Sequence, residues 1–178
     1  MIGVLLAVAL HGSTAGSDAC ASLVPPALRA VLTTAYPDHR LVLGTDHDHY
    51  HVQQSRKNGG SACLGVARAD FDGDGKRDLA VLLASAKKME TLLIAALRDG
   101  SGWKLELVET EDVAVRSKYV GTVKPGTHEA RHYGEPPLPN QLEKITSRTF
   151  GIDTGMLEST ARFFFRIDGR WVFVWMAD

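Results

Sequence analysis

The chain closes on the segment that most constrains its fold, ARFFFRI, an Asp-Gly pair at Asp168 and Gly169, and then RWVFVWM. Asp-Gly between two apolar runs is the strongest short-range signal for a β-hairpin. In an extended strand alternate side chains share a face, so Trp171 and Phe173 lie on one face and Val172 on the other. Both faces are apolar. We therefore expect a central strand that is covered on both sides, with a helix as one candidate for the cover.

Other segments of the chain also favour extended structure. Short apolar runs bounded by turn residues indicate strands, and they cover residues 40–44, 62–67, 79–84, 91–97, 103–108 and 118–123. The sequence RDGSG supplies the turn between the runs at 91–97 and 103–108. Residues 125–140 contain four prolines and are predicted to form an exposed loop.

One segment favours a helix. In residues 24–36, Leu28, Val31, Leu32 and Ala35 follow the spacing of one apolar helical face. Pro25 and Pro26 suit a first turn, and Pro37 ends the segment. The sequence thus predicts an α+β fold, a curved antiparallel β-sheet with one or two helices packed on one face.

Length and composition are those of one globular domain. The 178 residues are 44% hydrophobic and 23% charged, and the formal net charge is −1. Such a chain is long enough to bury a core, and it has no basic field to attract phosphate backbones, so we expect no nucleic-acid partner. We expect a monomer.

The N-terminal residues resemble a secretory leader in length and apolar character. Residues 1–10 are almost wholly apolar, too short to span a bilayer, and preceded by no Lys or Arg. Small residues at Ser13 and Ala15, and again at Ser17 and Ala19, give two cleavage patterns. We expect residues 1–19 to be a signal peptide and residues 20–178 to be one secreted or periplasmic domain, with no stable membrane span once the leader is removed. The alternative is a buried N-terminal strand or helix.

The chain has two cysteines, Cys20 and Cys63. In an oxidising compartment such a pair is expected to form a disulfide. Two buried free thiols are the alternative.

The stretch ADFDGDGKRDLAV places several like charges directly before an apolar run. Calcium prefers six to eight oxygen ligands, and carboxylates at alternate positions of a tight loop supply them. Counted from Asp70, the first, third, fifth and ninth positions are Asp70, Asp72, Asp74 and Asp78, and Lys76 at the seventh needs to offer only its carbonyl. Gly75 stands where the loop must turn sharply. We predict a Ca²⁺ site here. An Asp/Gly-rich turn without an ion is the alternative.

The spacing overlaps an EF-hand loop, but the twelfth position is Val81 and the residues that follow suit a strand. The pattern resembles instead the calcium loops of FG-GAP and VCBS-type repeats, whose signature Asp-x-Asp-x-Asp-Gly-x-x-Asp-Leu is matched from Asp70 to Leu79. The resemblance implies that these carboxylates and the Lys76 carbonyl hold Ca²⁺ between two strands. Without the twelfth-position Glu, we expect affinity on the order of 10⁻⁴ to 10⁻³ M.

The resemblance covers about fifteen residues (69–83) and occurs once, whereas a propeller needs several blades of the order of 40 residues each. The propeller architecture therefore does not carry over to this chain. We expect a structural calcium site in an exported binding or interaction module, with a protein or glycan partner, rather than an enzyme.

Two histidine patterns offer other functions. His128-Glu129-x-x-His132 matches the zinc metallopeptidase motif, with two ligands and a general base on one helix. Nearby prolines and glycines disfavour that helix, so we interpret the match as a loop and keep the peptidase as the alternative function. In residues 46–51, His47, His49 and His51 alternate, so in a strand they share one face and could bind zinc, copper or nickel. A solvated edge strand or loop is the interpretation that we favour there.

Overall fold

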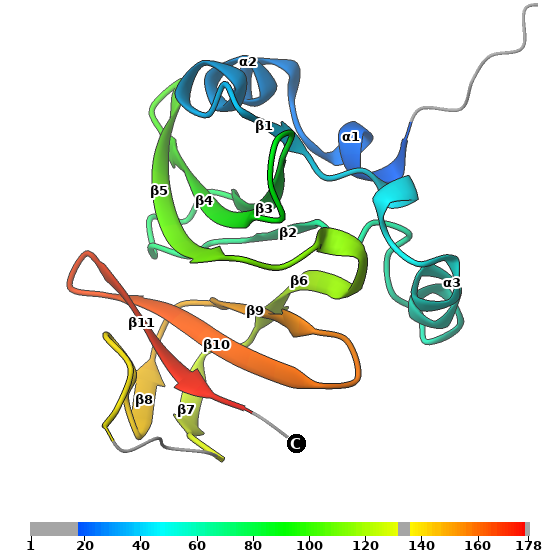
Figure 1. Cartoon of the computed structure of the whole chain (residues 1–178). Helices are drawn as coiled ribbons and strands as arrows, with labels where there is room; N and C mark the ends of the chain where they lie inside the picture. Colours follow the sequence, from blue (N-terminus) through cyan, green and yellow to red (C-terminus); the bar gives the residue numbers. More distant parts are fainter. Residues whose placement is uncertain (1–17, 132–135, 177–178) are drawn as a thin grey trace, which may run out of the picture.

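The computed structural model describes residues 18–131 and 136–176, which form two packed antiparallel sheets, with the helices Ala19–Leu23 and Pro26–Ala35 on the outer face of one of them (Figure 1). The first sheet has the order β1-β3-β4-β5, with β2 paired to β3, and the second has the order β11-β10-β9-β6. A small pair, β7-β8, forms a third layer. The predicted α+β class with a curved antiparallel sheet, and not a propeller, is confirmed.

The strands of the first sheet are β1 (His39–Leu41), β2 (Val66–Ala69), β3 (Asp78–Ser85), β4 (Thr91–Asp99) and β5 (Gly102–Glu111). Those of the second are β6 (Lys118–Val123), β9 (Gly151–Met156), β10 (Thr160–Ile167) and β11 (Arg170–Trp175), and the small pair consists of β7 (Gly126–Glu129) and β8 (Lys144–Ser147). Most of the predicted strands therefore form, with bounds shifted by a few residues.

The helices are α1 (Ala19–Leu23), α2 (Pro26–Ala35) and α3 (His49–Lys57). The predicted helix at 24–36 is confirmed as α2, where Leu28 and Leu32 are buried against the first sheet while Val31 is 37% exposed. Helix α1 begins directly after Asp18, whose carboxylate accepts hydrogen bonds from the backbone amides of Cys20 and Ala21. A domain boundary after Ala19 would therefore remove the N-terminal cap of α1.

Strand β3 shows why the first sheet is apolar on both faces. Ala80 and Leu82 point into the core between the two sheets, whereas Val81 and Leu83 point toward α1 and α2. Both sets are buried, so this strand reads as a continuous apolar run rather than an alternating one.

The terminal hairpin forms as predicted. Strands β10 and β11 pair in register from Arg162↔Trp175 to Ile167↔Arg170, and the turn residues Asp168 and Gly169 have positive φ values of 48° and 78°. The prediction of a central strand is wrong, because β11 lies at the edge of its sheet. Its Phe173 face is covered by the first sheet and its Val174 face by the β7-β8 pair, not by a helix.

Two segments differ from the sequence interpretation. Part of the predicted loop at 125–140 is a strand, β7, because residues 126–129 pair with β8. The histidine-rich segment 46–51 forms no strand, and it is a loop only at His47 and Asp48, since α3 begins at His49. Asp48 caps the helix α3, which contains His49 and His51, while His47 precedes it and is buried.

Charged side chains join the two sheets. Arg162 of β10 pairs with Glu109 and Glu111 of β5, and Glu111 also pairs with Lys118 of β6. Farther along the same strands, Arg166 donates to Glu106 through Nε and Nη2 at 2.9 and 3.0 Å.

Candidate metal site

The acidic segment is the connection between two core strands. Strands β2 and β3 are antiparallel with Ala69 opposite Asp78, so residues 70–77 form the turn that links them. Gly73 and Gly75 both have φ of +82°, a conformation that side chains with a Cβ rarely adopt. The glycine spacing noted in the sequence is therefore what allows the turn.

Three of the four aspartates converge in this turn. Asp70, Asp72 and Asp78 each offer a carboxylate oxygen, and these atoms lie within 4.8 Å of one another. Asp70 and Asp72 are partly exposed, while Asp78 is fully buried. Within residues 18–131 and 136–176 this is the one group of three or more His, Cys, Asp or Glu side chains with metal-ligand spacing.

Backbone amides hold the three carboxylates in place. Asp70 accepts hydrogen bonds from the amides of Gly73 and Gly75, at 2.7 and 2.9 Å. Asp78 accepts one from Phe71 through Oδ2 and one from Arg98 through Oδ1, both at 2.8 Å. Each carboxylate oxygen has two lone pairs, so these bonds orient the oxygens and still leave acceptor capacity for a cation.

The electrostatics of the turn favour a bound cation. Burial raises the pKa of Asp78 above its ordinary value, the amides of Arg98 and Phe71 oppose that shift, and the negative charges of Asp72 and Asp70 add to it. Like charges held this close repel one another. A divalent ion converts the repulsion into attraction.

The other two predicted ligands are placed differently. The Asp74 carboxylate lies outside the converging group and accepts from the Lys76 ammonium at 2.6 Å. The hydrogen bond to Lys76 lowers the pKa of Asp74. The ligand roles of Asp74 and of the Lys76 carbonyl stay predictions.

The turn is anchored in the core between the two sheets, a feature that the sequence interpretation missed. Phe71 is fully buried within the turn and meets Trp171 of β11 edge-on, with ring centroids 6.5 Å apart. A Cβ at Gly73 would lie 2.9 Å from Cγ2 of Thr149, so the turn also touches the segment before β9. The available signal was a large aromatic residue inside an otherwise polar loop.

The donor set fits a hard cation. Three carboxylates supply oxygen ligands only, the chemistry that Ca²⁺ and Mg²⁺ prefer. No nitrogen or sulfur donor belongs to the group, which argues against zinc or copper at this position.

The histidine motifs do not form comparable sites in the described residues. His128 and Glu129 lie on a strand, β7, rather than a helix. The His128 ring stacks on Phe165, while Glu129 pairs with Lys144 at 2.7 Å. His132 lies outside the described residues.

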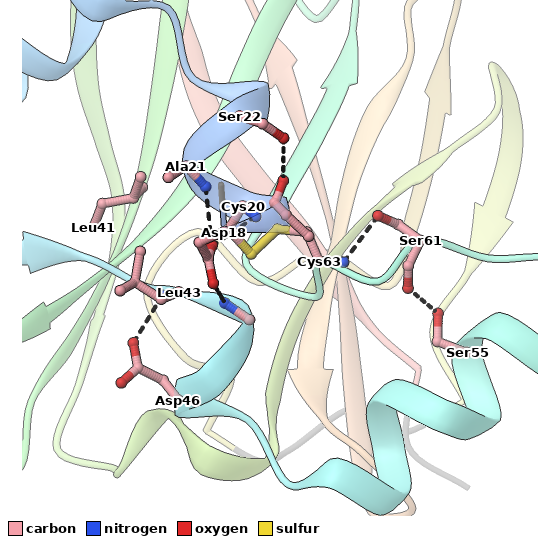
Figure 2. The surroundings of a disulfide bond; sticks show 12 residues. Asp18, Cys20, Ala21, Ser22, Leu41, Leu43, Asp46, Ser55, Ser61 and Cys63 are labelled. Carbon is pink, nitrogen blue, oxygen red and sulfur yellow. Dashed lines mark hydrogen bonds between the residues drawn. A yellow bond between two sulfur atoms is a disulfide. The ribbon is translucent and has the colours of Figure 1, made fainter. Parts of the chain in front are cut away.

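The two cysteines form a disulfide, as predicted. Cys20 of α1 and Cys63 before β2 have Cα atoms 4.8 Å apart, and both are buried (Figure 2). A disulfide is compatible with a secreted or periplasmic protein. Among the described helices, none combines the length and the apolar character that a membrane span requires.

Comparison with known proteins adds no assignment, since no protein-family profile, curated protein or solved structure matches this chain.

Proposed function

We propose that residues 70–78 bind Ca²⁺ and that the ion stabilises the turn between β2 and β3. The observation that carries the proposal is the convergence of the Asp70, Asp72 and Asp78 carboxylates within 4.8 Å. The spacing of these residues, with Gly75 and Leu79, also resembles the calcium loops of FG-GAP and VCBS-type repeats. Asp74 and the Lys76 carbonyl complete the proposed ligand set.

The role that we assign to the ion is structural. The turn connects two strands of the first sheet, and through Phe71 it contacts the second sheet at Trp171. An ion bound here would therefore fix the junction at which the two sheets meet. The turn lies against buried apolar side chains, and we assign it no catalytic step.

We further propose that the protein is exported and acts as a binding or interaction module with a protein or glycan partner. The disulfide supports an oxidising compartment, and the apolar residues 1–10 support a leader. A calcium affinity on the order of 10⁻⁴ to 10⁻³ M would suit an extracellular module.

Calorimetric titration with calcium tests the metal site. We expect saturable binding by the wild-type protein and loss of binding in Asp72→Asn. The matched control is Asp99→Asn, because Asp99 is exposed, its charge reaches Lys76 in the turn, and it lies outside the converging group. The control should bind like the wild type.

Two results would contradict the proposal. One is the absence of binding heat and of any rise in melting temperature at calcium concentrations of about 10 mM, well above the expected dissociation constant. The other is an equal loss of affinity in Asp72→Asn and Asp99→Asn, which would indicate only a diffuse attraction of the ion to negative charge.

A further inference from the structure

A second candidate binding site lies where α1, the turn after β1 and α3 surround a pocket of about 400 Å³. This volume lies within the range of small-molecule sites. The described residues that line the pocket are Asp18, Ala19, Gly44, Thr45, His47, His49, Val52, Arg56 and Ala62. None of them belongs to the proposed calcium site.

His47 is the unusual member of this lining. Its side chain is buried, with 6% of the residue exposed, and neither ring nitrogen has a hydrogen-bond partner among the described residues. The carbonyls of Val115 and Arg116 lie near the ring but make no hydrogen bond of normal geometry with it. Buried polar groups in folded proteins are almost always partnered, because an unpaired one carries its full desolvation cost. An unpaired buried imidazole at a pocket wall therefore points to a ligand.

Burial lowers the pKa of His47 below its ordinary value, although the charge of Asp46 opposes the shift. The ring is therefore neutral at pH 7, with one N–H donor and one acceptor nitrogen. A half-turn of the ring about its Cβ–Cγ bond exchanges nitrogen and carbon positions, so either edge of the ring can present a nitrogen. A complementary ligand offers both an acceptor and a hydroxyl.

Arg56 supplies positive charge at the same pocket. Its guanidinium makes no hydrogen bond or ion pair with any described residue, whereas the nearby Arg40 and Arg116 pair with Asp46 and Asp48. The one carboxylate in the lining, that of Asp18, already accepts three backbone amides, from Cys20, Ala21 and Gly44. These amide hydrogen bonds orient the carboxylate but leave its charge in place, and that charge also reaches His47. The attraction for an anion therefore rests on Arg56, whose guanidinium has no ion-pair partner among the described residues.

The walls of the pocket are tied together before any ligand arrives. Ala19 and Ala62 in the lining directly precede Cys20 and Cys63, so the disulfide links the two sides (Figure 2). Ser61 accepts from Ser55 of α3 at 2.7 Å through its carbonyl, and its hydroxyl accepts from the amide of Cys63 at 2.9 Å. Such cross-links lower the entropic cost of binding, because the site is already ordered.

We infer that this pocket binds a small oxyanion that carries a hydroxyl, with Arg56 pairing its charge and His47 exchanging hydrogen bonds with it. Hydrogen phosphate and hydroxycarboxylates share this chemistry. The inference is independent of the proposed calcium site.

Nitrogen-detected NMR of the histidine rings tests the inference in calcium-free buffer, because phosphate and citrate both sequester calcium. Inorganic phosphate and citrate are the two probes, and sodium chloride at equal ionic strength is the control. We expect the His47 ring nitrogens to shift with a saturable probe and not with chloride. The probe whose binding saturates at the lower concentration identifies the preferred class of ligand, phosphate or hydroxycarboxylate.

Matched variants separate the site from general charge attraction. Arg56 and Lys57 are adjacent exposed cations in the last turn of α3, and only Arg56 lines the pocket. Arg56→Gln should weaken binding about tenfold, as expected for loss of a charge-assisted hydrogen bond, and Lys57→Gln by less than about twofold. His47→Leu removes the unpaired imidazole, so this variant should remain folded and lose the binding. Calorimetric titration with the same two probes measures its affinity, because the variant has no His47 ring signal to follow.

Three results would overturn the inference. The first is the absence of any shift of the His47 ring nitrogens up to about 50 mM of either probe, a concentration at which even weak sites fill. The second is an equal loss of affinity in Arg56→Gln and Lys57→Gln. The third is an unchanged affinity in folded His47→Leu.

Discussion

Asp78→Asn separates the hydrogen-bonding role of this residue from its proposed role as a calcium ligand. Asp78 is fully buried, and its two oxygens accept from the amides of Phe71 and Arg98 at 2.8 Å each. Asparagine keeps one acceptor oxygen and turns an NH₂ group toward the other amide. One buried N–H then faces a donor and loses its hydrogen bond.

The cost follows from that count. One buried donor left unpaired destabilises the fold by about 1–3 kcal/mol, which for a domain of this size lowers the melting temperature by roughly 2–12 °C. Asp72→Asn should cost little without calcium, because the Asp72 side chain accepts only the Asp74 amide, at 3.1 Å in an exposed turn, and asparagine can accept it too. With calcium at about ten times its dissociation constant, the wild type gains about 1.4 kcal/mol, and both variants lose this gain.

Urea denaturation measures the free energy of unfolding of the wild type and the two variants, each with chelator and with about 10 mM calcium. We expect Asp78→Asn to be destabilised in both conditions and Asp72→Asn only with calcium. Wild-type stability of Asp78→Asn in chelator would refute the hydrogen-bond reasoning. Equal destabilisation of Asp72→Asn with and without calcium would refute its assignment as a ligand.

Three further predictions concern the disulfide and two carboxylates. Replacing Cys20 and Cys63 by alanine should cost about 4 kcal/mol for a sequence separation of 43 residues, and an unchanged urea midpoint would contradict this. Burial tends to raise the pKa of Glu106. The hydrogen bonds from Arg166, Lys104 and Trp171 outweigh this effect and lower the pKa from 4.5 to about 2. The stability from Glu106 is therefore present above pH 4.5 and lost as pH falls through about 2. Arg166→Gln should move acid unfolding, followed by tryptophan fluorescence, to higher pH, and coincident curves would argue against the pairing. Burial raises the pKa of Asp78, so the folded state favours its protonated form. Its contribution to the free energy of unfolding is therefore present below pH 3.8 and is lost as pH rises through the raised pKa. Calcium needs the deprotonated form, so calorimetric affinity should rise with pH over that window, and an affinity independent of pH would exclude Asp78 as a ligand.

Local signals in the sequence predicted the elements whose cause is local. The Asp-Gly turn at 168–169 predicted the β10-β11 hairpin, because both residues adopt the positive φ that this turn requires. Helix α2 followed from its apolar spacing and its flanking prolines. The alternate spacing in a glycine turn predicted that all four aspartates would converge; Asp70, Asp72 and Asp78 do so, whereas Asp74 pairs with Lys76.

The division into two sheets could not be predicted in the same way. An apolar strand face indicates that something covers it, and the pattern does not say whether the cover is a helix or another sheet. Helix α3 was missed because its composition is polar. It has one buried side chain, Val52, and its start depends on the Asp48 cap.

A bulge in β5 decides which glutamates meet the second sheet, and nothing in the sequence marks it. The register shifts between Leu93 and Ile94, so Glu106 and Glu109 lie opposite Ala95 and Leu93 and share one face. Three residues apart in a regular strand, they would point to opposite faces. The bulge thus lets Glu106 pair with Arg166 and Glu109 with Arg162 across the gap between the sheets.

Arg166 connects these ion pairs to the acidic turn and bears on the proposed cation site there. Its pKa is raised first by the hydrogen bond to Glu106, and the charges of Asp72 and Asp78 also contribute. The Glu106 carboxylate at 2.9 Å therefore already balances most of the Arg166 charge, so Arg166 attracts the carboxylates of the turn only weakly. One such charge does not balance the three converging carboxylates, because attraction falls with distance whereas their mutual repulsion acts within 4.8 Å. A divalent ion placed among the carboxylate oxygens acts at ligand distance. It would thereby neutralise the carboxylate charges that Arg166, already paired with Glu106, leaves unbalanced.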